Sequence, residues 1–151
     1  VARRAGVAAA TAYTYFASKE HLVTEVFWSR VRNVGQPDAE AFDGPAERVT
    51  AALDPITAMI AEEPELAAAC TVAMLSDDAE VRLVRDQIGA HWSALARDAA
   101  GEEASDAQLL TVESALSGLL LRAGMGHMEY TVIPEQLAAV CAVAFGTGGQ
   151  R

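Results

Sequence analysis

The spacing of apolar residues is the feature that most restricts how this chain can fold. In one long segment, apolar side chains recur three or four positions apart, at Val81, Val84, Ile88, Trp92 and Leu95. This spacing places them on one face of an α-helix. Stretches of Val, Ile, Thr and aromatic residues that would favour strands are scarce, whereas Ala and Leu are abundant. We therefore predict an all-α protein.

Start and stop signals divide the chain into helices joined by short connections. Ser18 and Ser105 are typical N-cap residues, and the second has the spacing of a capping box. Pro64 and Pro134 are typical of the first turn of a helix. The predicted helices cover residues 18–34, 45–62, 66–75, a segment capped by Ser76 that ends near residue 100, 106–130 and 134–146. Residues 35–45 are polar and rich in Gly, Pro and Asp, and we predict a loop there.

Charge is distributed unevenly between the start of the chain and the rest. The net charge is −10, which by itself argues against a nucleic-acid partner. Residues 1–34, however, hold five basic and two acidic residues, a net charge of +3, against −13 for the remainder. A basic end on an acidic body suits a protein that meets phosphates with one end only.

The two cysteines and the lack of targeting signals favour the cytoplasm. Cys70 and Cys141 lie far apart in apolar, helix-like surroundings, so we predict two small buried side chains in a reducing compartment and no disulfide framework. No run of apolar residues is long enough to span a bilayer, and no secretory signal opens the chain.

The first residues have the plan of a helix-turn-helix. Residues 1–5 have the composition of the middle of a helix and Gly6 stands where its cap is expected, so we expect a further segment to precede Val1. A short second helix is predicted from Ala8 to Phe16. Ala12 and Phe16 share its inner face, which leaves its small and hydroxyl-bearing residues facing outward. Such a helix can enter the major groove of DNA.

Three runs in this region resemble the DNA-binding segment of the TetR family: VARRAGV at residues 1–7, TAYTYF at 11–16 and SKEHL at 18–22. The resemblance covers about 30 residues. It implies a homodimer that binds a pseudo-palindromic operator, with a helical body that binds a small effector.

The same resemblance implies which residues face DNA. Lys19 matches the phosphate contact at the start of the helix that follows the recognition helix. Under the alternative reading, Tyr13 and Tyr15 are a half-buried aromatic pair and Thr14 is a surface residue. The residues that match the DNA-facing set are Ala8, Ala9, Ala10, Thr11, Tyr13, Thr14, Tyr15 and Lys19.

The helices beyond residue 34 are expected to enclose an effector cavity, although side chains of the candidate types are more often ordinary core than ligand wall. His91 could offer a polar contact to a ligand. His21, His91 and His127 lack the spacing of metal ligands, so neither a metal nor a cofactor is expected. The candidate ligand-binding residues are Phe27, Met59, Met74, Ile88, His91, Trp92, Leu95 and Met125.

The last two helices are predicted to form the dimer interface. The middle of the helix from 106 to 130 is rich in leucine on all sides, which suggests the core on one side and a partner subunit on the other. The final helix would complete a four-helix interface with Leu137, Val140, Cys141, Val143 and Phe145. Three glycines, Gly118, Gly124 and Gly126, either allow close helix approach or mark a bend.

We therefore expect two parts: a helix-turn-helix segment with its linking helix at residues 1–34, and an effector-binding and dimerisation domain at 35–151. The predicted function is that of a repressor, with duplex DNA, a largely apolar effector and a second copy of the chain as partners. Movement of the linking helix on effector binding would change the spacing of the recognition helices. An activator, a dimeric ligand carrier that does not bind DNA and a helical-bundle enzyme stay open as alternatives, although no nucleophile or phosphate-loop motif supports an enzyme.

Overall fold

A computed structural model describes residues 16–38 and 41–146, and every element in this part of the chain is helical. The proposed recognition residues from Ala8 to Tyr15 lie outside the described residues. The elements are α2 (Lys19–Arg32), α3 (Gly44–Glu62), α4 (Pro64–Ala73), α5 (Ala79–Ala100), α6 (Asp106–Gly124), the 3-10 helix η2 (Tyr130–Val132) and α7 (Ile133–Gly146). The predicted all-α fold is confirmed.

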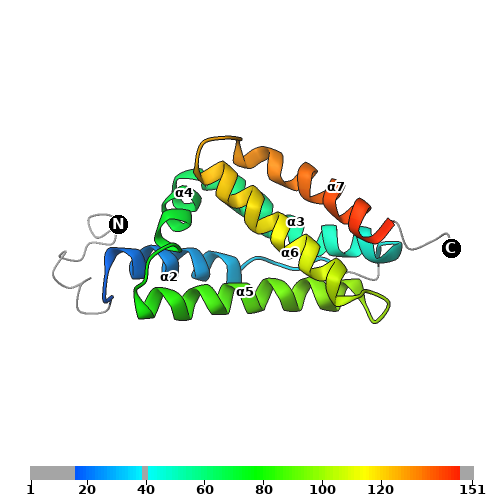
Figure 1. The fold of residues 1–151 in the computed structure, drawn as a ribbon, viewed down its shortest axis with the longest axis horizontal. Coiled ribbons are helices and arrows are strands. Elements are labelled where there is room, and N and C mark those ends of the chain that lie inside the picture. Colours follow the sequence, from blue (N-terminus) through cyan, green and yellow to red (C-terminus); the bar gives the residue numbers. More distant parts are fainter. Residues whose placement is uncertain (1–15, 39–40, 147–151) are drawn as a thin grey trace.

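The helices form two groups around α3 (Figure 1). Helices α2 and α5 lie side by side along one long edge of the molecule, and α4 stands across them at the end nearer the N-terminus. Helix α3 packs against α5 on one side and α7 on the other, and α6 lies against α7. None of the described helices is long and apolar enough to cross a membrane.

Helix α3 supplies the centre of the core. Val49, Leu53, Ile56 and Ile60 are all buried, as their spacing of three and four positions predicts. Complete burial of an aliphatic side chain of this size contributes about 1.5–3 kcal/mol. Thr57 lies fully buried among them, and its hydroxyl donates to the carbonyl oxygen of Asp54 at 3.0 Å. This bond within the helix satisfies the buried hydroxyl.

The predicted N-caps are confirmed at two helices and wrong at a third. The Ser18 hydroxyl accepts from the backbone N–H of His21 at 3.0 Å, and Ser105 forms the expected capping box with Gln108. Helix α5 is capped by Asp78, not by Ser76. The Asp78 carboxylate accepts from Glu80 N–H, whereas the Ser76 hydroxyl accepts from Asp78 N–H and so stabilises the turn before the helix.

Helix α6 ends earlier than the predicted limit of residue 130. It stops at Gly124, and Gly126 has a φ of +75°, in the left-handed region that favours glycine. The N–H of His127 donates to the carbonyl oxygen of Arg122 at 2.9 Å, a bond that closes this type of helix end. Gly126 therefore marks the turn, and a separate 3-10 helix follows before α7.

Most of the residues in the final helix that were predicted to form a dimer interface are buried within their own subunit. Leu137, Cys141 and Phe145 are buried in the core of a single protomer, so their predicted place in a dimer interface is wrong. They occupy the face of α7 that packs against α3 and α6. Val143 points away from the core and is 70% exposed.

Candidate effector cavity

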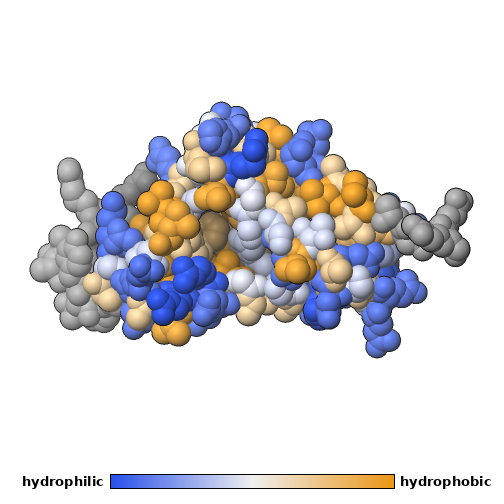
Figure 2. Space-filling model, in the orientation of Figure 1, coloured by the Kyte–Doolittle hydropathy of each residue, from blue (hydrophilic) through white to orange (hydrophobic). Residues whose placement is uncertain are grey.

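A cavity of about 420 Å³ lies where α2, α4, α5 and α6 meet, with a contribution from the end of α3. Figure 2 shows it as a hollow between α4 and α6, bordered by apolar surface. A volume of this size suits a small organic ligand. Its walls are formed by Phe27, Ile60, Ala67, Cys70, Thr71, Met74, Leu75, Arg85, Ile88, Gly89, Trp92, Ser117, Leu120 and Leu121.

Small residues on facing helices leave this space open. Gly89 of α5 and Ser117 of α6 both line the cavity, and both also line a smaller hollow of about 100 Å³ farther along the same helices. A Cβ atom added at Gly89 would meet no atom within 4 Å. The side chains at these two positions are too small to fill the space between α5 and α6, so the cavity stays open there.

A close contact fixes the opposite wall. A Cβ atom on Gly124 would lie 2.7 Å from Thr71 Cγ2, so α6 and α4 approach each other there as only glycine permits. The sequence suggested that the glycines of this region either allow close helix approach or mark a bend, and Gly124 allows close approach. Gly118, by contrast, has no atom within 4 Å of an added Cβ in the described protomer.

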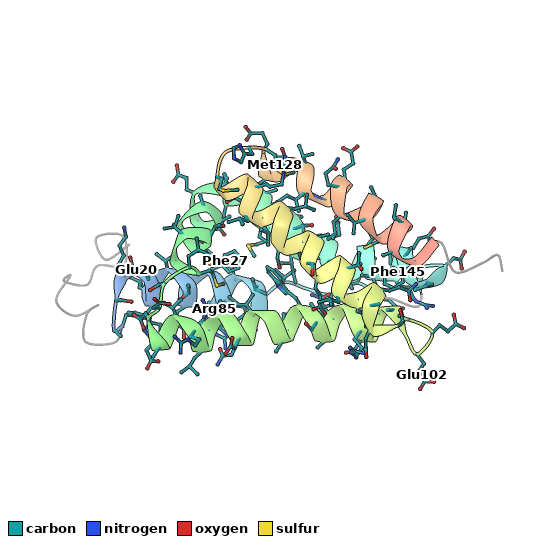
Figure 3. The ribbon with its side chains drawn as sticks, viewed as in Figure 1. Glu20, Phe27, Arg85, Glu102, Met128 and Phe145 are labelled. Atoms are coloured by element: carbon teal, nitrogen blue, oxygen red, sulfur yellow. The ribbon has the colours of Figure 1, made fainter. Side chains whose placement is uncertain are left out.

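Thr71 and Ser117 donate their hydroxyls to carbonyl oxygens of their own helices, which leaves two other polar side chains in the wall. Arg85 Nη1 donates to the carbonyl oxygen of Met74 at 2.7 Å, which ties α5 to the end of α4. Figure 3 shows Arg85 on α5 near Phe27 of α2, at the end of the molecule where α4 meets them. The indole Nε1 of Trp92 is buried without a hydrogen-bond partner among the described residues. A buried donor without a partner costs about 1–3 kcal/mol.

Cys70 adds an unreactive thiol to the cavity wall. Its side chain is 3% exposed, and burial raises the pKa of its thiol to about 12. Burial also raises the pKa of the Cys141 thiol. Both cysteines are buried as predicted, and both stay protonated at neutral pH.

A hydrogen bond joins the start of α2 to the start of α5. The Ser18 hydroxyl, which caps α2, also donates to the Asp78 carboxylate, the cap of α5, at 2.5 Å. This bond, followed by the bond from Glu80 N–H, holds the pKa of Asp78 below its usual value. The segment from Met74 to Asp78 thus connects Arg85 in the cavity wall with the N-terminus of α2.

The structure brings together four of the predicted ligand-binding residues. Phe27, Met74, Ile88 and Trp92 line the cavity.

The other four predicted ligand-binding residues lie outside the cavity wall. Met59 and Leu95 pack against the core, and Met125 is 54% exposed at the end of α6. His91 packs edge-on against the Trp28 ring, with centroids 5.4 Å apart.

Sequence reasoning missed Arg85 and Gly89, although a signal for both exists. Ile88 and Trp92 were predicted wall residues, and Arg85 and Gly89 occupy the same face of α5 at spacings of three and four. The walls from α4 and α6 carry no comparable signal, because Ala67, Cys70 and Ser117 are types found in any helix. In the described part of the chain, no group of three His, Cys, Asp or Glu residues could hold a metal ion.

A wider depression of about 580 Å³ is lined by residues of α3, α7 and the segment before α3, including Phe42 and Ala138. No residue of α2 takes part in it. The cavity of 420 Å³ is the better candidate site, because it touches the helix that follows the N-terminal segment.

Comparison with known proteins supports this architecture. A crystal structure of a TetR transcriptional regulator from Rhodococcus sp. RHA1 matches with a TM-score of 0.69 at 22% identity, over 98% of this chain and 83% of that chain. The present structure therefore has the same fold class as that regulator, a helical bundle of the TetR type. A sequence profile described as "Bacterial regulatory proteins, tetR family" matches residues 1–26.

Uncharacterized HTH-type transcriptional regulators of Mycobacterium bovis and Mycobacterium tuberculosis are 43% identical to the chain over 143 residues. The match covers 93% of the chain and 66% of each relative, so the chain spans just under two thirds of their length. The chain belongs to the TetR family of bacterial regulatory proteins, a family of regulators and not of enzymes. The resemblance found in its first residues is confirmed.

Proposed function

We propose that the protein is a transcriptional repressor that binds a pseudo-palindromic operator as a homodimer and is released by a small effector in the cytoplasm. The observation that carries this proposal is the continuity of α2. The family match at residues 1–26 runs into α2, and the next residue, Phe27, forms part of the cavity wall. An effector in the cavity would therefore touch the helix that follows the DNA-reading segment.

Lys19 supports the DNA-binding part of the proposal. It is exposed in the first turn of α2, where a cation gains nothing from the helix dipole, so its charge suits an external phosphate. The other proposed DNA contacts are Ala8, Ala9, Ala10, Thr11, Tyr13, Thr14 and Tyr15, in the sequence that the family profile matches.

Coupling between cavity and operator would run through α2 and the Ser18–Asp78 hydrogen bond. Two recognition helices of a dimer must lie about 34 Å apart to enter successive major grooves. Because α2 packs against both α4 and α5, a ligand that separates these helices would shift α2 and this distance.

Exposed faces of α6 and α7 support the homodimer. Leu110 is 63% exposed and Leu121 is 40% exposed on α6, while Val143 is 70% exposed on α7. Figure 2 shows apolar surface gathered over α7. Helices α6 and α7 pack against each other, so a second copy would cover both with a four-helix contact.

Operator selection from genomic fragments tests the proposal. The full-length protein should retain specific fragments with a Kd of roughly 10⁻⁸–10⁻¹¹ M, and affinity should fall as salt rises. Lys19→Gln should lower the salt slope by about 1, whereas Arg97→Gln, at the far end of α5, should leave it unchanged. Failure to bind duplex DNA even at low ionic strength would favour the ligand carrier.

A further inference from the structure

The part of the chain that the structure describes places one charged residue in the cavity wall, without an opposite charge beside it. Arg85 is the only described residue with a charged side chain that lines the cavity. No carboxylate of the described residues lies within ion-pair distance of it, and it donates a hydrogen bond to the neutral Met74 carbonyl. A guanidinium has five N–H donors in a planar fork, which matches the two oxygens of a carboxylate.

The rest of the wall determines what else the ligand must contain. Phe27, Ile60, Ile88 and Leu120 come from four different helices and offer only apolar surface. A volume of about 420 Å³ holds on the order of a dozen non-hydrogen atoms, if each takes roughly the 30 Å³ of a liquid water molecule. A single guanidinium balances a single negative charge, which favours a monoanion over a phosphate dianion.

We propose that the effector is an amphipathic monocarboxylate of about this size, with its carboxylate on Arg85 and its apolar body between α2, α5 and α6. The inference rests on the proposed function only in taking this cavity as the effector site. Binding of the carboxylate would compete with the Met74 carbonyl for Arg85 and free the end of α4. The segment that begins there carries Asp78, which holds the cap of α2.

Fluorescence titration of the purified protein tests the class of ligand. Trp28 lies outside the cavity against His91 and Arg32, so a Trp28→Phe background leaves Trp92 in the cavity wall as the only tryptophan. The probes are decanoate, decanol, decylamine and decyl phosphate, each below its micelle concentration. Decanoate should bind about tenfold or more tightly than decanol, because the alcohol leaves the cation unpaired.

Variants at Arg85 separate charge recognition from simple apolar binding. Arg85→Met should bind decanoate and decanol equally, and Arg85→Lys should keep part of the preference because it keeps the charge. Arg82→Met, an exposed cation one turn earlier that does not line the cavity, should behave like the parent protein. Thermal melting confirms that each variant is folded.

Several outcomes would overturn the proposal. Equal affinity for decanoate and decanol, an unchanged preference in Arg85→Met, or binding of none of the probes would each do so. Tighter binding of decyl phosphate would assign the cavity to phosphate monoesters instead. Operator binding is measured separately, so a protein that binds DNA but no carboxylate contradicts this inference alone. A protein that binds decanoate but no DNA contradicts the proposed repressor alone.

Discussion

At the scale of single residues, Gly124 fixes how closely α6 approaches α4. Gly124→Ala would place a methyl group 2.7 Å from Thr71 Cγ2. We expect a loss of about 1–3 kcal/mol in the free energy of unfolding, because the two helices must move apart. Gly89→Ala, which meets no atom within 4 Å, is the control and should gain up to about 1 kcal/mol from helix propensity. Urea unfolding of both variants measures the difference, and equal stabilities would show that the contact is not tight.

The two thiols allow a second prediction at this scale. Burial raises the pKa of Cys70 to about 12, so its reactive thiolate is almost absent at pH 8. Iodoacetamide should therefore label neither cysteine in the native protein and both after addition of urea, as mass spectrometry of the labelled peptides would show. Rapid native labelling of Cys70 would mean that the cavity wall opens more readily than the structure implies.

At the scale of elements, the Ser18–Asp78 bond should make the junction of α2 and α5 sensitive to acid. The folded pKa of Asp78 is lowered, so its ionised form stabilises the fold at neutral pH, and this contribution is lost as pH falls through the folded pKa. Asp78→Asn should thus lose less unfolding free energy than the parent between pH 7 and pH 3. Chemical denaturation across this range provides the test, with the exposed neighbour substitution Asp77→Asn as control. An identical pH profile in Asp78→Asn would exclude the link.

How far the sequence predicts each element depends on whether its signal is local. The spacing of Val49, Leu53, Ile56 and Ile60 is local, and it predicts their burial in α3. The Ser105 capping box is also local and was found. The cavity has no local signal, since it depends on the distance between α5 and α6. For this reason Met59 and Leu95 were predicted to line it, but they pack against the core.

At the scale of the whole molecule, the exposed faces of α6 and α7 predict the oligomeric state. The substitutions Leu110→Glu and Val143→Glu together should convert the proposed dimer to a monomer, because each places a charge in the apolar contact. Leu83→Glu changes a residue of α5 that is 57% exposed, and it should leave the dimer intact. Sedimentation analysis distinguishes these cases. A double variant that stays dimeric would place the interface elsewhere.

The proposed repressor mechanism requires that the cavity control operator affinity through α2. Gly89→Leu tests this most directly, because Gly89 lines the cavity and an added Cβ atom there meets no atom within 4 Å. We predict that its Kd for the operator is higher by about 5- to 150-fold than that of Gly89→Ala, the range of typical coupling between two sites. Equal operator affinity in the two variants, both folded and dimeric, would contradict this mechanism.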